Sequence, residues 1–174
     1  MEIYIRNVSD IPEYHDEIIE MLIAGDNDFF PPLSQRSSIT QTELSGDINV
    51  GGSIMKYFEE MKTEKIVCAV EDGKLLAFVT YLENLKNSRI SEEELPNIYI
   101  STLLAKPECR GRGITKQMYT LLFEEYKTAN IFTRTWGTNF AHISILDKFG
   151  FSEHLRIKDD RAPGVDTVYF VKRP

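Results

Sequence analysis

This chain of 174 residues has little cysteine, no long apolar run and no excess of positive charge. Its two cysteines, Cys68 and Cys109, lie far apart, which excludes a disulfide framework and a cysteine-rich metal site and predicts reduced thiols. No stretch approaches the ~18 to 20 apolar residues that span a bilayer. The charged N-terminal segment 1–6 also lacks the hydrophobic region of a signal peptide. We therefore expect a cytoplasmic protein with no membrane association and no bound metal.

Acidic residues outnumber basic ones, 27 to 20, which gives a net charge of −7. A nucleic-acid backbone is bound by a broad basic surface, so we expect no nucleic-acid partner. Hydrophobic residues make up 42% of the chain, enough for one sizeable core. We therefore predict a single domain over residues 1–174. The oligomeric state stays open, with a homodimer as one option.

Hydrophobic periodicity predicts a strand over 2–8 and a helix that begins at a capping box of Asp10 and Glu13 and ends at Gly25. A long loop follows over 26–52, and its aromatic residues favour a packed lid over disorder. The remaining predicted elements are a helix over 53–62, strands over 64–71 and 74–82 joined by Asp72-Gly73, a strand over 98–105, a helix from 114, a strand over 131–136, a helix over 139–149 and strands over 151–158 and 166–172. This order predicts an α/β fold with a mixed sheet and helices on its faces.

The most informative stretch joins the strand over 98–105 to the helix that begins at Ile114. Gly111 and Gly113 adopt positive φ at little cost, so successive backbone N–H groups can converge ahead of the helix. The start of the helix adds free N–H groups and the positive end of its dipole. Arg110, Arg112 and Lys116 surround this turn with cationic donors, which predicts a pyrophosphate site.

Two common phosphate-binding motifs do not account for this turn. A dinucleotide-binding motif requires a third glycine, and that position is Lys116. A P-loop requires Gly-x-x-x-x-Gly-Lys-Ser/Thr, which the chain does not contain.

With Arg110-Gly-Arg-Gly-Ile114 followed by Asn139 and the segment Lys148-Phe-Gly-Phe151, the sequence resembles the GNAT superfamily of acetyl-CoA dependent N-acetyltransferases. The resemblance covers nearly the whole chain. It implies a mostly antiparallel sheet of about seven strands, in which strands 4 and 5 splay apart, with helices on both faces. It also implies transfer of the acetyl group of acetyl-CoA to a primary amine of a small molecule or peptide.

The resemblance assigns the cofactor contacts to particular positions. It implies that backbone groups of Leu103, Leu104 and Ala105 meet the pantetheine arm and that Asn139 contacts the cofactor beyond the splayed strands. The residues implied to bind the pyrophosphate are Arg110, Gly111, Arg112, Gly113, Ile114, Thr115 and Lys116.

Two positions depart from the family pattern. Thr115 replaces Gly or Ala but keeps its backbone N–H and adds a hydroxyl, so we expect the phosphate site to persist. Leu146 replaces the Tyr that protonates the departing thiolate in many members. Because a thiol pKa near ~8.5 makes the thiolate a tolerable leaving group, transfer remains feasible. The alternative is a catalytically weak or inactive module that binds acetyl-CoA.

The acceptor amine must lose a proton, and the family often has a carboxylate near the start of the fourth strand. Asn97 lies there in this chain and cannot act as a base. The candidates for catalysis are Glu94, the nearest carboxylate, with Tyr99 and His142 as alternatives. Arg134, Asp159, Asp160, Arg161 and Asp166 are more consistent with a solvated closing loop than with an acceptor site. The net acidic charge favours a cationic amine as the acceptor.

Overall fold

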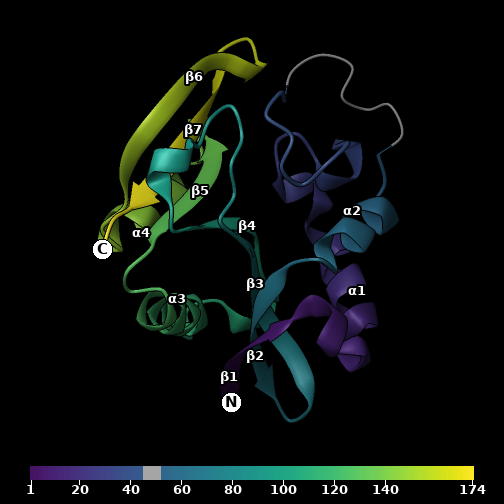
Figure 1. The fold of residues 1–174 in the computed structure, drawn as a ribbon. Helices are drawn as coiled ribbons and strands as arrows, with labels where there is room; N and C mark the ends of the chain where they lie inside the picture. The colour runs from purple at the N-terminus through teal and green to yellow at the C-terminus, as the bar shows by residue number, and fades with distance from the viewer. Residues whose placement is uncertain (45–51) are drawn as a thin grey trace.

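A computed structural model of the protein describes residues 1–44 and 52–174 (Figure 1). The strands are β1 (Glu2–Asn7), β2 (Lys65–Glu71), β3 (Lys74–Glu83), β4 (Asn97–Ala105), β5 (Asn130–Trp136), β6 (Ser152–Ala162) and β7 (Val165–Lys172). The α-helices are α1 (His15–Gly25), α2 (Ile54–Met61), α3 (Ile114–Glu125) and α4 (Phe140–Lys148). Among these described residues, no helix is long and apolar enough to cross a membrane.

All seven strands form one sheet in the order β1-β2-β3-β4-β5-β7-β6. Neighbouring strands are antiparallel except β4 and β5, which are parallel. The parallel pairing covers only the segment 97–100 of β4 and the segment 130–133 of β5. Beyond it the two strands separate, and the sheet divides into two arms (Figure 1). The predicted mixed sheet with splayed strands 4 and 5 is therefore confirmed.

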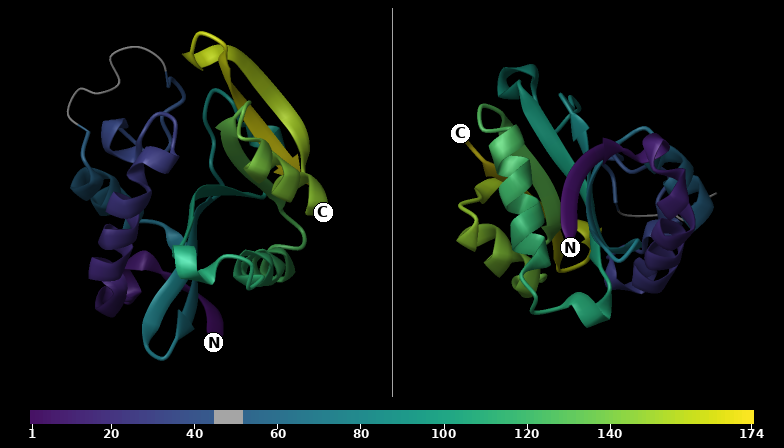
Figure 2. Two further views of the ribbon diagram at one scale, coloured as in Figure 1. Left: turned by 180° about the vertical axis from the view of Figure 1, so that it is seen from behind. Right: turned by 90° about the horizontal axis from the view of Figure 1, so that it is seen from below.

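Helices cover both faces of the arm made by β1 to β4, with α1 and α2 on one side and α3 on the other (Figure 2). Strand β2, which lies between β1 and β3 in this arm, shows why helices cover both faces. Ile66, Cys68 and Val70 pack toward α1 and α2, whereas Val67 and Ala69 pack toward α3. A strand buried on both faces has a nearly continuous apolar sequence, and each large side chain it buries contributes roughly 1.5–3 kcal/mol. This double burial makes the arm a rigid support for the residues that β4 presents.

A third apolar cluster lies on the short parallel pairing of β4 with β5. Tyr99 of β4, Phe132 of β5 and Tyr169 of β7 are almost completely buried there, together with Ile90 and Val171. These side chains hold the two arms together where they meet. The point at which β4 and β5 separate is therefore fixed by packing as well as by hydrogen bonds.

The first helix begins later than the capping box predicts. Two short 3₁₀ turns, Val8–Asp10 and Pro12–Tyr14, precede α1, which begins at His15 without a side-chain cap. The Asp10 carboxylate instead accepts hydrogen bonds from Asn7 and Ser9. A residue that precedes proline is kept out of the α conformation, so Ile11, which precedes Pro12, interrupts the helix.

The hairpin of β2 and β3 is confirmed, with positive φ at Asp72 and Gly73 as a type I′ turn requires. The prediction of a polar loop over 159–164 is wrong for most of its length. Strand β6 continues to Ala162, and both Asp160 and Arg161 are only 6% exposed. These charged residues lie inside the protein because β6 and β7 form a long hairpin that leans toward the 26–44 segment.

The 26–44 segment packs against the domain, as a lid would. Leu33, Ile39 and Leu44 are at most 2% exposed. Arg134 of β5 donates hydrogen bonds to the carbonyl oxygens of Ile39 and Gln41, which ties this segment to the second arm. The rest of the predicted loop, 45–51, lies outside the described residues.

Candidate active site

A cavity of about 300 Å³ opens where β4 and β5 separate. Its walls come from the last residues of β4, from Thr133 to Trp136 of β5, and from α3, α4 and the 26–44 segment. Since β4 loses its parallel neighbour after Ile100, its following residues face this space. The absence of a strand partner leaves backbone groups available to a ligand.

Most residues predicted to contact the pantetheine arm lie together in this cavity. Leu103, Leu104 and Ala105 line it from β4, and Asn139 lines it from the start of α4. Asn139 is also the N-cap of α4, because its Oδ1 accepts a hydrogen bond from the backbone N–H of His142. Its Nδ2 donates to Thr135 Oγ1 at 2.9 Å. Asn139 thus fixes the helix against β5, and its contact with a cofactor stays a prediction.

The glycine turn has the backbone conformation that the sequence predicts. Gly111 and Gly113 have φ values of 77° and 71°, and Gly113 is the N-cap of α3. No atom lies within 4 Å of the Cβ that either glycine would carry, so the space in front of the turn is open. The turn can therefore present backbone N–H groups to an anion. Glycine is required at these two positions by the positive φ and not by a lack of space for a side chain.

The cationic side chains around the glycine turn do not all face the same cavity. Arg110 and Thr115 line the cavity, whereas Lys116 lines a second hollow of about 380 Å³ between α3 and α4. Arg112 instead donates two hydrogen bonds of 2.9 Å to Glu71 at the end of β2. The structure therefore places Arg110 and Lys116 beside possible ligand positions, while Arg112 is held by the β2–β3 hairpin.

The three predicted catalytic candidates are not brought together. His142 lines the cavity, and burial lowers the pKa of its imidazole, so the ring is neutral near pH 7. The ring of Tyr99 packs in the cluster on the parallel pairing, and burial raises the pKa of its hydroxyl. Glu94 lies outside the cavity lining and forms an ion pair of 2.8 Å with Arg173. That pairing lowers the pKa of Glu94, which is the opposite of what a base near pH 7 requires.

A carboxylate that sequence analysis missed lies behind the cavity wall. Glu64, just before β2, is 2% exposed, and its Oε2 accepts a hydrogen bond of 2.6 Å from the hydroxyl of Ser101. Ser101 lines the cavity because it is the extra residue of a β-bulge, where β4 has one more residue than β3. The other carboxylate oxygen of Glu64, Oε1, is buried and has no hydrogen-bond partner among residues 1–44 and 52–174. Burial raises the pKa of Glu64 to about 7.

A second missed residue is Tyr119 of α3. Tyr119 lines the cavity, its ring stacks on Phe149, and its buried hydroxyl has no hydrogen-bond partner in the described part of the chain. Burial raises the pKa of Tyr119, so the hydroxyl stays protonated. Leu146 occupies the position where the family that the sequence resembles often has a Tyr. It is fully buried in the same apolar cluster as Tyr119. No sequence motif marks Tyr119 or Glu64, because both depend on how the sheet and helices pack.

Within residues 1–44 and 52–174, no group of three His, Cys, Asp or Glu side chains is placed to hold a metal ion. A buried carboxylate with a pKa near 7 can accept a proton at nearly neutral pH, and a protonated hydroxyl can donate a hydrogen bond to a developing negative charge.

Comparison with known proteins identifies related folds. The sequence model of the acetyltransferase (GNAT) family matches residues 36–151. No curated protein sequence gives a significant match. The structure resembles a ribosomal-protein-alanine N-acetyltransferase from Brucella melitensis, at 16% identity and a TM-score of 0.64, with all of both chains covered. It also resembles an N-acetyltransferase from Staphylococcus aureus, at 17% identity and a TM-score of 0.65, with 99% of both chains covered. A protein from Salmonella typhimurium, solved with its cofactor acetyl-CoA, gives 10% identity and a TM-score of 0.65, with 99% of this chain and 94% of that chain covered.

Proposed function

Because the chain belongs to the GNAT acetyltransferase family and is an acyltransferase, we propose that it transfers the acetyl group of acetyl-CoA directly to a primary amine. The observation that carries the proposal is the separation of β4 from β5 beside an open glycine turn. That arrangement supplies an unpaired backbone edge and an anion site in one place. We further propose that residues 1–174 act as a single acetyltransferase domain.

The residues present fit acetyl-CoA. Leu103, Leu104 and Ala105 would hold the pantetheine arm along the part of β4 that has no β5 partner. The Gly111–Gly113 turn and the start of α3 would hold the pyrophosphate, with Arg110 and Lys116 beside it. Bound in this way, acetyl-CoA supplies an activated thioester. A backbone N–H at Leu104 or its neighbour would stabilise the negative charge that develops on the thioester oxygen.

Glu64 is the proton acceptor that the geometry favours. A neutral amine beside Ser101 attacks the acetyl carbon, so that an N–C bond forms while the C–S bond breaks. The amine proton passes through the Ser101 hydroxyl to the carboxylate of Glu64. A pKa of about 7 makes Glu64 suitable as a base near neutral pH. His142, whose imidazole is neutral at the cavity wall, is the alternative acceptor among the predicted residues.

Tyr119 is the proton donor that the geometry favours. The departing thiolate needs a proton. The side chain of Leu146, at the position where many family members carry Tyr, has no proton to donate. Tyr119 lines the cavity, and its protonated, buried hydroxyl has no hydrogen-bond partner among the described residues. Overall one proton leaves the amine and one reaches the sulfur, and proton exchange with solvent returns Glu64 and Tyr119 to their starting states.

The competing function is a catalytically weak or inactive module that binds acetyl-CoA, and Leu146, at the position where many family members carry Tyr, favours it. Thiol release from acetyl-CoA, measured with a panel of small and peptide amines, separates the two. Sustained release that requires one class of amine supports transfer. Tight binding of acetyl-CoA by calorimetry with no release above the amine-free rate supports the inactive module.

A further inference from the structure

Three arginines from separate segments converge on the cavity. Arg36 comes from the 26–44 segment, Arg134 from β5 and Arg161 from β6, and all three line the same space. Arg36 and Arg161 are only 7% and 6% exposed. Charged guanidinium groups are costly to bury, so their convergence requires an explanation.

Each of these arginines is hydrogen-bonded to uncharged oxygens. Arg36 donates from Nε and Nη2 to the carbonyl oxygen of Pro31, at 3.2 and 3.1 Å. Arg134 donates to the carbonyl oxygens of Ile39 and Gln41 and to the hydroxyl of Tyr169. Arg161 donates to Thr167 Oγ1 at 3.0 Å and to the carbonyl oxygen of Phe30. Among the described residues, no carboxylate forms an ion pair with any of the three.

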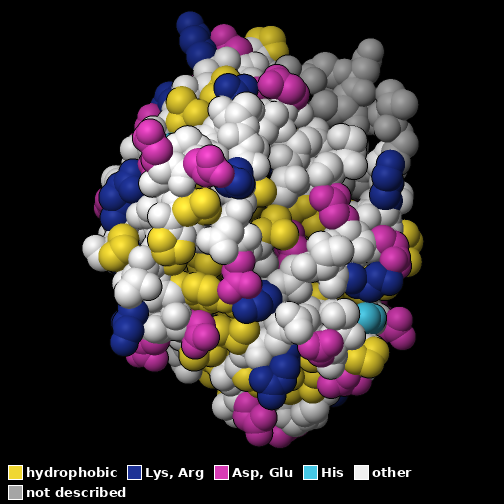
Figure 3. Space-filling view, in the orientation of Figure 1, with side chains coloured by type: hydrophobic (Ala, Val, Ile, Leu, Met, Phe, Trp, Pro, Cys, Tyr) yellow, Lys and Arg dark blue, Asp and Glu magenta, His cyan; other side chains and the backbone are white. Residues whose placement is uncertain are grey.

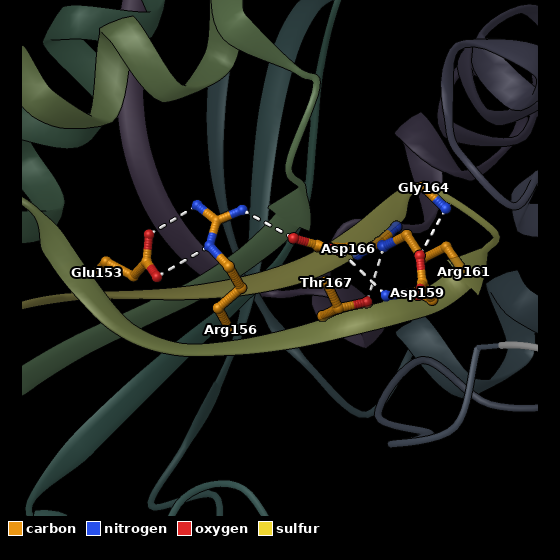
Figure 4. A network of polar contacts seen from close by, with 7 residues as sticks. All are labelled: Glu153, Arg156, Asp159, Arg161, Gly164, Asp166 and Thr167. Atoms are coloured by element: carbon orange, nitrogen blue, oxygen red, sulfur yellow. Dashed lines mark hydrogen bonds and ion pairs between the residues drawn. The ribbon is translucent and has the colours of Figure 1, made fainter.

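Four other arginines, Arg89, Arg112, Arg156 and Arg173, form ion pairs with carboxylates. On the same strand as Arg161, Arg156 contacts both Glu153 and Asp166, as Figure 4 shows, whereas Arg161 meets only the Thr167 hydroxyl in that view. On the face in Figure 3, Lys and Arg side chains are likewise scattered among Asp and Glu. Burial without an ion-pair partner among the described residues therefore distinguishes Arg36 and Arg161 from these surface arginines.

The carboxylates nearest to the cluster are engaged elsewhere or lie at its edge. Asp26 accepts two hydrogen bonds from Ser34, and Asp160 accepts one of 2.6 Å from Thr167. Asp28 lines the cavity but is exposed. Asp26 and Asp160 are near enough to act on Arg36 and Arg161, but among the described residues no carboxylate makes a direct ion pair with any of the three arginines.

The arginines also have donors left over for a ligand. Nη1 of Arg36 and Nη2 of Arg161 have no hydrogen-bond partner in the described part of the chain. Burial, followed by repulsion from Arg36 and Arg134, lowers the pKa of Arg161. An anion bound between these groups would supply the missing countercharge and accept the free donors.

We propose that the acceptor amine carries an oxyanion, a carboxylate or a phosphate, and that Arg36, Arg134 and Arg161 bind it. This inference rests on the proposed acetyl transfer and names its substrate class. The arginines and Ser101 line the same cavity, so a bound oxyanion would hold the amine of the same molecule in the cavity that the proposed proton relay faces. The cavity of about 300 Å³ fits a small acceptor. The acidic net charge of the chain favoured a cationic acceptor, whereas the positive charge of the arginines at the cavity favours an acceptor that carries an anionic group.

The test uses pairs of amines that differ only in the anion. An α-amino acid is compared with its carboxamide, and an amino-sugar phosphate with the unphosphorylated amino sugar; a polyamine represents cationic acceptors. Thiol release at saturating acetyl-CoA gives kcat/KM for each, and calorimetry on the acetyl-CoA complex gives affinity. We expect an anionic member to exceed its neutral partner by about tenfold or more, because charge-assisted bonds to buried arginines would be lost. The carboxylate and phosphate arms distinguish the two oxyanions.

Arg161→Gln and Arg161→Lys link the preference to the cluster, and Arg156→Gln on the same strand is the matched control. Both Arg161 variants should raise KM for the anionic amine about tenfold or more and leave the affinity for acetyl-CoA unchanged, since Lys lacks the guanidinium fork. Arg156→Gln should change neither. If Arg161→Gln does not fold, as judged by circular dichroism, the comparison of paired amines on the unaltered protein decides.

The outcomes separate this inference from the function on which it rests. Equal or better turnover and binding of the carboxamide, the free amino sugar or the polyamine would overturn the oxyanion proposal while acetyl transfer stands. Absence of thiol release with every amine would contradict the transfer reaction. In that case, calorimetric binding of an anionic amine that Arg161→Gln abolishes would still support an oxyanion site, and absence of such binding would reject it.

Discussion

The hydroxyl of Ser101 donates a 2.6 Å hydrogen bond to Glu64, a residue 37 positions earlier in the chain. The bond connects the wall of the cavity to a buried carboxylate on the neighbouring part of the sheet. Thr80 Oγ1 lies 2.8 Å from the same Ser101 hydroxyl and helps to fix its position. The relationship gives the proposed reaction a route by which a proton leaves the cavity.

Replacement of Glu64 by Gln should lower kcat by about 10²-fold, the usual contribution of a general base. In the unaltered protein, kcat/KM should rise with pH through about 7 as Glu64 loses its proton, and this rise should disappear in Glu64→Gln. Steady-state kinetics between pH 5.5 and 9 provides the measurement. Glu59→Gln, which alters only an exposed ion pair of α2 with Lys62, is the control and should behave like the unaltered protein. An unchanged pH profile in Glu64→Gln would remove Glu64 from the mechanism.

The same substitution should change the pH dependence of stability. Burial raises the pKa of Glu64 from 4.5 to about 7, so between these values the folded protein holds more protons than the unfolded chain. The stability due to this group is therefore complete below pH 4.5 and is lost as pH rises through about 7. Relative to the unaltered protein, Glu64→Gln should gain stability between pH 5 and 8, on the order of 3 kcal/mol. Urea unfolding at both pH values measures the difference, and a constant offset would show that Glu64 does not titrate in this range.

Tyr119→Phe should separate catalysis from stability. Without the hydroxyl, kcat should fall by about 10²-fold while the affinity for acetyl-CoA persists. The folded state should gain about 1 kcal/mol, because a buried hydroxyl without a partner is removed. Tyr81→Phe is the matched control, since Tyr81 is also fully buried but its hydroxyl contacts Tyr126 outside the cavity lining. A normal kcat in Tyr119→Phe would mean that the thiolate obtains its proton elsewhere.

Gly113→Val should sharply weaken binding of acetyl-CoA. The φ of 71° is strained for Val by roughly 1–3 kcal/mol, so the turn would shift and its N–H groups would no longer converge. Gly73→Val carries a similar penalty, because its φ is 73° and its Cβ would meet no atom within 4 Å. Calorimetry should therefore show a loss of affinity in the first variant only, with both proteins folded. Equal affinities in the two variants would contradict the assignment of the turn to the pyrophosphate.

Sequence patterns predicted the elements that depend on short-range signals. The Asp72-Gly73 hairpin, the glycine turn and the capped helix after Asn139 follow from residue types that specify their own backbone conformation. The capping box of Asp10 failed because Pro12 restricts the residue before it, a competing local rule that outweighed the motif.

The charged residues of the closing hairpin show where local signals end. Asp160 and Arg161 have the composition of a solvated loop, yet β6 extends through them and buries both. Burial of a charged side chain depends on which distant segment packs over it, and here that is the carbonyl of Phe30 in the 26–44 segment. No periodicity within β6 contains that information.

The sequence by itself determined the fold family, the strand that leads into the glycine turn and the helix beyond it. These features depend on the types of residues that are contiguous in the chain. Only the tertiary structure decided which charges share the cavity. Glu64 meets Ser101 through a bulge in β4, and Arg36, Arg134 and Arg161 converge from three separate segments. The pKa of a carboxylate and the charge of a pocket depend on burial and on neighbours distant in sequence. Those contacts exist only once the sheet has divided at β4 and β5.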